Sequence, residues 1–411
     1  MDLTVIAIPY YFGTMGAEYA YLKRTGKDRA PIGGDYELHD TLASLAMGTG
    51  SLFAPMFFQK VVGPITPGKG KYAKVFVGVA AGAAAVATLA DMKARRDELG
   101  RLPEAGTLPA TTASTATTAD ATDSSAMPAA PRGRRARRSL TRKVAGSAAA
   151  TAVMTGALAV STAWASKTAA KRLFAANDRD LGTGVAATVG AVLAWDFIYY
   201  WNHRLMHTSR WMWAIHVAHH SSEHYNLSTA LRQTVTDVAG TFVPYGLMSV
   251  AGFRPESIET ARGVNLLYQY WIHTETIPKL GPIEEVFNTA SHHRVHHGSN
   301  RQYLDRNHGS IFIIWDRLFG TFEREDEPVV YGLTKNIGTF NPLRIATHEF
   351  KDILADVAAS DTWRERLNFA FRGPGWAYER HRQLGDVDLL AAAEAPPEAI
   401  DTVGHIASAS A

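Results

Sequence analysis

The sequence contains no cysteine among its 411 residues. Disulfides, cysteine-ligated zinc or iron–sulfur sites and thiol nucleophiles are therefore excluded. Net charge is also small, at +3, so the charge balance gives no sign of a nucleic-acid partner. The motifs His-Glu-x-x-His, Gly-x-Ser-x-Gly and Gly-x-Gly-x-x-Gly are absent too. The usual signatures of zinc hydrolases, serine hydrolases and fused flavin or nicotinamide domains are therefore missing.

Long apolar stretches are what the sequence has instead, and 46% of its residues are hydrophobic. A membrane-spanning helix needs roughly 20 apolar residues. Six stretches approach that length and a seventh, 258–272, is weaker; the six are 3–22, 41–62, 75–90, 144–165, 182–201 and 234–252. No basic residue precedes the first stretch, which favours a retained membrane helix over a cleaved signal peptide. We expect an all-α, multi-pass integral membrane bundle, with the buried helices of a soluble bundle as the alternative.

Basic residues suggest how such a bundle is oriented. The segment that follows the third stretch is the most basic and includes the run RGRRARR at 132–138. The positive-inside rule places this segment in the cytoplasm, and counting onward places the histidine motifs described below there as well. The Ala-, Arg- and Thr-rich composition indicates a bacterial plasma membrane, with the endoplasmic reticulum as the eukaryotic alternative.

Composition also divides the chain into regions. Residues 102–130 are low-complexity Ala, Thr, Ser and Pro, with too few apolar side chains to fold. The regions that we expect are N-terminal transmembrane helices at 1–92, a disordered basic linker at 93–143, transmembrane helices with a histidine-box catalytic core at 144–330, a C-terminal cytosolic segment at 331–388 and a disordered tail at 389–411.

Three histidine motifs carry the chemistry. They read HRLMH at 203–207, HVAHH at 216–220 and HHRVHH at 292–297, and His273 follows the weak apolar stretch. On a helix, spacings of three and four place rings on one face. Eight or nine imidazoles exceed the four ligands of tetrahedral zinc, and they suit two metals of higher coordination number. Imidazole binds iron, zinc, copper and nickel alike, so the spacing leaves the metal open.

A disordered metal-sequestering tract is one alternative to a folded metal centre. Trp201, Trp211, Trp213, Tyr225 and Trp315 lie among the histidines and favour folded structure. We therefore predict a cytosolic histidine-rich helical cap that holds a di-metal site. A non-enzymatic membrane metal-binding protein is the alternative from another functional class.

The motifs WNHRLMH, HVAHHSSEHYNLSTALRQ, YQYWIHTE, SHHRVHHGSN and IIWDRLFGTFERE resemble the fatty acid hydroxylase/sterol desaturase superfamily of integral-membrane di-iron enzymes. Within this superfamily, the motifs are most similar to those of the alkylglycerol monooxygenase subfamily. The resemblance implies that the metal ligands are His203, His207, His216, His219, His220, His273, His293, His296 and His297. His292 is an extra imidazole, either a tenth ligand or a neighbour of the ligands. His308 and the histidines outside the motifs are expected to be structural.

The resemblance also implies a reaction class. Two iron ions and O2 would oxidise a lipid from the bilayer, with electrons from tetrahydrobiopterin or an external electron-donor protein. Ether cleavage of an alkylglycerol and hydroxylation or desaturation of a sterol or fatty acyl chain are both open. Thr208 stands where the resemblance leads us to expect Glu, so the substrate and the pterin requirement stay open.

Polar residues near the motifs could orient the imidazole rings through hydrogen bonds. Metal-bound imidazoles usually donate their second nitrogen's hydrogen to a carboxylate, carbonyl or water. Glu275, Glu223 and Asp196 could each accept such a hydrogen, and Asn226 could do the same or bind a metal-bound water. The alternative for each is a helix cap or a surface ion pair.

Overall fold

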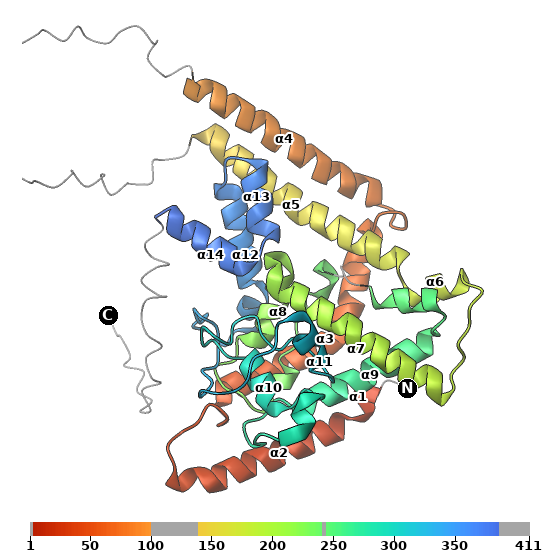
Figure 1. The fold of residues 1–411 in the computed structure, drawn as a ribbon. Coiled ribbons are helices and arrows are strands. Elements are labelled where there is room, and N and C mark those ends of the chain that lie inside the picture. The colour runs from red at the N-terminus through yellow and green to blue at the C-terminus, as the bar shows by residue number, and fades with distance from the viewer. Residues whose placement is uncertain (1–2, 100–138, 241–243, 386–411) are drawn as a thin grey trace, which may run out of the picture.

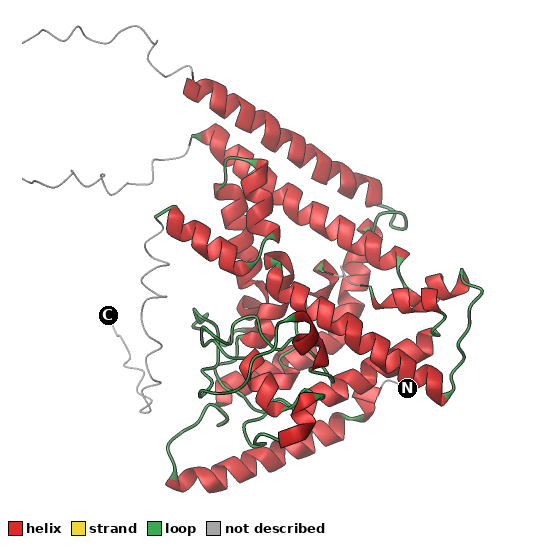
Figure 2. Cartoon of the chain, in the orientation of Figure 1, coloured by secondary structure: helices red, strands yellow, loops and turns green. Residues whose placement is uncertain are grey.

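The computed structural model describes residues 3–99, 139–240 and 244–385, and it consists of helices joined by loops (Figure 1, Figure 2). Within these residues there is no β-strand, and an isolated antiparallel bridge joins Phe287 to Phe312. The prediction of an all-α fold is confirmed.

The α-helices run in chain order through α1 Leu3–Ile6, α2 Ile8–Thr25, α3 Leu38–Val62, α4 Ala73–Leu99, α5 Leu140–Lys167, α6 Ala170–Ala175, α7 Val185–Thr208, α8 Arg210–His220, α9 Pro255–Trp271, α10 Ala290–His296, α11 Ile314–Phe319, α12 Pro342–Ala359, α13 Trp363–Phe371 and α14 Pro374–Gln383. Short 3-10 segments stand between them at η1 Gly26–Asp28, η2 Gly63–Ile65, η3 Thr229–Leu231, η4 Asp237–Ala239, η5 Tyr245–Ala251 and η6 Gly281–Glu285.

Within the described residues, three helical segments are long and apolar enough to cross a membrane. They are Leu38–Ile65, Ala73–Leu99 and Leu140–Lys167, with mean hydropathies of 1.3, 1.8 and 1.5. Their positions agree with the apolar stretches expected at 41–62, 75–90 and 144–165. Figure 1 shows α4 and α5 side by side as an antiparallel pair. The Ala and Gly residues of both helices allow such close packing.

The other expected spans have different outcomes. Residues 3–22 are divided between α1 and α2, while 182–201 lies mostly within α7 and 258–272 almost wholly within α9. A single helix through 234–252 is wrong. Gly240 and Pro244 have non-helical backbones with φ of −146° and −89°, so η4 and η5 are separate short 3-10 segments.

The expected region boundaries are only partly covered by the described residues. Helix α4 continues to Leu99 and α5 begins at Leu140, so both ends of the region 93–143, expected to be a linker, are helical. The rest of that region, 100–138, and the tail at 389–411 lie outside the described residues.

The C-terminal helices hold the membrane pair against the helix that carries the second histidine motif. Trp211 and Ile215 of α8 share one buried cluster with Val153 of α5 and Ile353 of α12. Gly146 of α5 is pressed against α12, because a Cβ there would lie 2.2 Å from the carbonyl oxygen of Ala358. These contacts fix α8 against the apolar pair.

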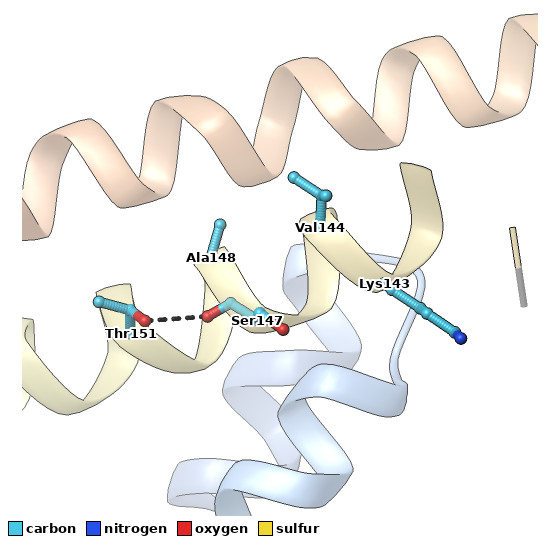
Figure 3. A pocket seen from close by; sticks show the side chains of 5 residues that line it. All are labelled: Lys143, Val144, Ser147, Ala148 and Thr151. Atoms are coloured by element: carbon cyan, nitrogen blue, oxygen red, sulfur yellow. Dashed lines mark hydrogen bonds between the residues drawn. The ribbon is translucent and has the colours of Figure 1, made fainter. Parts of the chain in front are cut away.

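Two cavities lie in the membrane-helix region. A shallow hollow of 380 Å³ runs along α5, where Val144 and Ala148 point toward α4 (Figure 3). A second cavity of 440 Å³ lies between α3 and α5 and also touches Val235 and Asp237. The lining of neither cavity contains a histidine.

Candidate metal centre

The first two histidine motifs lie on consecutive helices. His203 and His207 stand one turn apart near the end of α7, and α8 starts after the extended Ser209. The start of α8 is held by Arg210, whose guanidinium lies 2.6 Å from both Glu349 and Asp356 of α12. Buried guanidinium groups paired in this way are strongly oriented. The N-terminal end of α8 is therefore fixed against α12, which positions the histidine motif that this helix carries.

The remaining histidines arrive from two further elements. His273 follows the C-terminal cap of α9, and the third motif forms α10 with His297 as its cap residue. Histidines 203, 207, 219, 220, 273, 293, 296 and 297 are all at most 8% exposed, and His216 is partly buried. Figure 1 shows α8, α10 and α11 gathered near the end of α7.

These nine histidines form two compact groups. The first group consists of His203, His207, His216, His220 and His296, and the second of His219, His273, His293 and His297. Within each group, the potential ligand atoms all lie within 4.8 Å of one another. The groups adjoin, since the ring centroids of His220 and His297 are 4.4 Å apart. Each His-x-x-His-His motif is thus divided between the two groups.

The spacing of the nitrogens is that of a coordination sphere. The Nε2 atom of His216 lies 2.8 Å from that of His203 and 3.1 Å from that of His220. In the second group, the Nε2 atom of His273 lies 3.1 Å from that of His219 and 3.0 Å from that of His293. Metal–nitrogen bonds of about 2.1 Å place neighbouring ligands about 3 Å apart. Both groups therefore have the size of a site for one metal ion.

Main-chain carbonyls hold the outer nitrogens of these rings. The Nδ1 atom of His273 lies 2.7 Å from the Gln269 oxygen, and that of His219 lies 3.3 Å from the Arg232 oxygen. A carbonyl only accepts, so each Nδ1 carries the hydrogen and each Nε2 keeps a free lone pair for a metal.

One short loop contacts three rings of the first group, two of them through main-chain carbonyls. The Nδ1 atom of His296 lies 2.8 Å from the Arg306 oxygen, and that of His203 lies 2.9 Å from the His308 oxygen. The Nδ1 atom of His207 faces the Asp305 carboxylate at 3.5 Å. We call residues 305–308 the orienting loop.

Several ring nitrogens are left without any protein partner. The Nε2 atoms of His207, His296 and His297 are buried and make no hydrogen bond. A buried acceptor without a partner costs free energy, and a bound metal would remove that cost. Burial also lowers the pKa of His273 to about 4 and holds those of His219 and His297 well below the ordinary value. The rings are therefore neutral, which is the form that binds metals.

Comparison with known proteins shows which family part of the chain resembles. Residues 188–321 match the model of the fatty acid hydroxylase family. They contain all nine histidines of the two groups. We call this matched segment the hydroxylase domain, after the family that it resembles. The resemblance of the motifs to that superfamily is confirmed.

Several known proteins are similar to part of the chain. Human alkylglycerol monooxygenase is 49% identical over 187 residues, which are 45% of this chain and 42% of that protein. The zebrafish (Danio rerio) alkylglycerol monooxygenase is 44% identical over 197 residues, which are 48% and 44% of the two chains. Ornithine lipid hydroxylase OlsE of Rhizobium tropici is 28% identical over 145 residues, or 34% of this chain and 42% of that protein. The matches thus span less than half the length of each relative. No solved structure matches the chain.

The polar residues predicted to help the hydroxylase domain make other contacts. Asp196 accepts hydrogen bonds from the main-chain N–H groups of Ile311 and Phe312 and from the indole of Trp315. It lies seven residues before His203, about 10 Å along the helix, which is too far to reach that ring. Asp196 instead fixes the turn that leads into α11.

Glu275 and Asn226 make hydrogen bonds to loop residues. Glu275 accepts a hydrogen bond from the Gly34 N–H and another from the Tyr331 hydroxyl, at 2.8 and 2.7 Å. The side-chain oxygen of Asn226 accepts from the N–H and hydroxyl of Ser228. These bonds shape the surroundings of the site, and the expected bonds to imidazole rings are not among them.

Glu223 and His292 belong to neither group. Glu223 is an exposed residue, and desolvation of its carboxyl group raises its pKa above the ordinary value. His292 is 3% exposed, but its ring packs against Phe322 with centroids 5.4 Å apart. Adjacent residues on a helix point about 100° apart, so His292 faces away where His293 faces the metal centre.

His308 is the residue that the motif analysis missed. It was expected to be structural, yet it is 1% exposed and its ring centroid lies 4.9 Å from that of His207. The sequence signal was weak, because one histidine eleven residues after the third motif has no recognisable spacing. Only the return of the loop toward α7 brings it to the site.

Proposed function

We propose that this chain is a membrane-bound di-iron monooxygenase that uses O2 to hydroxylate a C–H bond of a lipid. The observation that carries the proposal is the division of nine histidines into two adjoining groups of five and four. A donor set made only of imidazole suits iron, and five nitrogens exceed what tetrahedral zinc accepts. The similarity to alkylglycerol monooxygenases supports the reaction class.

The residues of the chain would act by binding and orientation. The free Nε2 atoms would hold the two metals, and the carbonyls of Gln269, Arg306 and His308 keep three rings in register. Burial of the histidines keeps bulk water away. Two irons bound there would supply the activation of O2 that an unreactive C–H bond requires.

An alkylglycerol is the substrate that we favour. Hydroxylation of the carbon next to the ether oxygen would give a hemiacetal, which breaks into an aldehyde and a glycerol derivative. One oxygen atom enters the product, and the other leaves as water with two electrons and two protons. Tetrahydrobiopterin or an electron-donor protein would supply those electrons.

The alkyl chain would reach the site from the bilayer. The 440 Å³ cavity lies between α3 and α5, both apolar enough to span a membrane. Val235 lines this cavity and packs against the buried cluster that contains Ala218, which lies between His216 and His219 on α8. A largely apolar cavity connected by packing to the helix of the second histidine motif is suited to a lipid tail.

Hydroxylation or desaturation of a sterol or fatty acyl chain is the second candidate. The similarity to an ornithine lipid hydroxylase favours hydroxylation without ether cleavage. We further propose that the metal centre faces the cytoplasm of a bacterial plasma membrane, in agreement with the basic residues near the start of α5. A membrane metal-binding protein without catalysis is the candidate from another class.

The deciding experiment combines metal analysis with turnover. The purified full-length chain should contain about two irons, and it should consume O2 when given an alkylglycerol and reduced tetrahydrobiopterin. With ¹⁸O2, mass spectrometry should find one labelled oxygen in the aldehyde. A labelled alcohol without cleavage would favour the second candidate, and a product two hydrogens lighter would indicate desaturation.

The control is the variant His220→Ala, which removes a ring from the first group. It should bind less iron and lose turnover. Iron binding without O2 consumption on any of the lipids would favour the non-catalytic alternative, and a wild-type chain that binds no iron would refute the proposal.

A further inference from the structure

His308 lies against the first histidine group although it belongs to no motif. Its ring centroid is 4.9 Å from that of His207 and 5.7 Å from those of His203 and His296. Neighbouring rings within the group have centroids 4.4 to 6.4 Å apart. His308 is therefore as close to three members as the members are to one another.

The two ring nitrogens of His308 are in different states. Its Nε2 atom lies 3.1 Å from the carbonyl oxygen of Asp305. That oxygen can only accept, so Nε2 carries the hydrogen and Nδ1 of the neutral ring has a free lone pair. The Nδ1 atom is buried and has no hydrogen-bond partner. An unpaired buried acceptor beside a metal site is an available ligand.

The backbone around His308 is held in an uncommon conformation. Asp305 and Asn307 have φ of 58° and 55°, in the left-handed region that non-glycine residues rarely adopt. The carboxylate of Asp316 accepts the N–H groups of both His308 and Gly309 at 2.7 Å. Such backbones persist where surrounding contacts fix them, and they concentrate at ligand sites. The ring of His308 is thus kept at the group by its own loop.

We propose that His308 is a displaceable ligand, through Nδ1, of the metal held by the first group. This inference depends on the proposed metal centre. The Nδ1 atom is not among the five that lie within 4.8 Å of one another, so it lies at the rim of the group, beside His203, His207 and His296. Five imidazoles leave one position of a six-coordinate metal. His308 fills that position at rest and leaves when a small ligand binds.

His292 provides a matched control. It is also buried, its Nδ1 atom also lacks a partner, and it lies beside the ligand His293. Its ring, however, packs on Phe322 and belongs to neither group. The two residues thus share burial and an unpartnered Nδ1 atom, and they differ in whether the ring lies against the first group.

The test uses the full chain in detergent, stripped of metal and reloaded with Co²⁺, with azide as the small ligand. Wild type and the variants His308→Phe and His292→Phe should each bind about two Co²⁺. His308→Phe should change the visible Co²⁺ spectrum and bind azide on the order of tenfold more tightly, because a competing occupant has been removed. His292→Phe should match wild type in both measurements.

Two results would overturn the inference: a His308→Phe spectrum and azide affinity equal to those of wild type, or the same changes in His292→Phe. If His308→Phe does not fold, wild type decides by X-ray absorption. Azide should then lower the average number of histidine imidazoles per cobalt, and an unchanged number would refute displacement. A wild-type chain that binds no Co²⁺ would instead refute the metal centre itself.

Discussion

The Nδ1 atom of His203 lies 2.9 Å from the main-chain oxygen of His308, which is 105 residues later in the chain. This contact joins the end of α7 to the orienting loop. The same loop offers the Arg306 oxygen to His296, from the third motif. Residues near both ends of the hydroxylase domain are therefore needed to align one metal group.

The division into two groups predicts how single substitutions change metal content. His207→Ala removes a ring of the first group and His273→Ala a ring of the second, so each variant should fall from about two metals to about one. Metal analysis after equilibrium dialysis would measure this.

His39→Ala is the matched control, because His39 is exposed and belongs to neither group. It should keep both metals. Loss of both metals in each of the two site variants would show that the groups do not act as separate sites.

A buried ion pair supports the second group from outside. Arg232 and Asp40 are 2.6 Å apart with side chains 1% and 4% exposed, and the Arg232 oxygen accepts from His219. Asp40→Asn would leave the guanidinium buried without its counter-charge, which costs about 3–5 kcal/mol. Thermal unfolding in detergent should show this loss.

Asp180→Asn tests whether the loss of stability expected for Asp40→Asn depends on burial of the ion pair. Asp180 pairs with Arg254 at 2.7 Å, but both side chains are more than 40% exposed. Its loss should leave the unfolding temperature almost unchanged. Equal effects of the two substitutions would contradict the importance that we give to the buried pair.

Helix α5 offers two glycines with opposite surroundings. An added Cβ at Gly146 would meet the Ala358 carbonyl oxygen at 2.2 Å, whereas at Gly156 nothing lies within 4 Å. Gly146→Ala should therefore destabilise the chain by about 1–3 kcal/mol through overpacking. Gly156→Ala should be neutral or stabilising by up to about 1 kcal/mol, because alanine favours a helix. Unfolding of both variants measures the difference, and a stable Gly146→Ala chain would mean that α5 and α12 are further apart.

The absence of cysteine makes the orientation in the membrane directly testable. Lys335 and Lys71 are both exposed, one after the hydroxylase domain and one between α3 and α4. In intact cells, a membrane-impermeant maleimide should label Lys71→Cys and spare Lys335→Cys until the cells are opened. The reverse pattern would place the metal centre outside.

The sequence predicted which histidines cluster better than how they are arranged. The three- and four-residue spacings identify which rings share a helix face, and all nine predicted ligands lie in the two groups. The spacings do not predict that His219 and His220 belong to different groups. That division depends on where α10 and His273 pack against α8, and such tertiary contacts leave no local pattern.

The errors have physical causes too. The apolar run 234–252 has the length of a span, but Gly240 and Pro244 break it. Asp196 has the helical spacing to share a face with His203, but two helical turns separate the two side chains, so they are not in contact. His308 stands alone in sequence and reaches the centre only through the orienting loop.

Two of the three contacts from the orienting loop to the metal centre come from peptide oxygens and not from side chains. Replacing the Arg306 side chain therefore leaves the acceptor for His296 in place. Homologues could therefore differ widely in the side chains of the orienting loop and still hold their imidazole rings in the same orientation. Sequence divergence in this loop would be poor evidence of a lost activity.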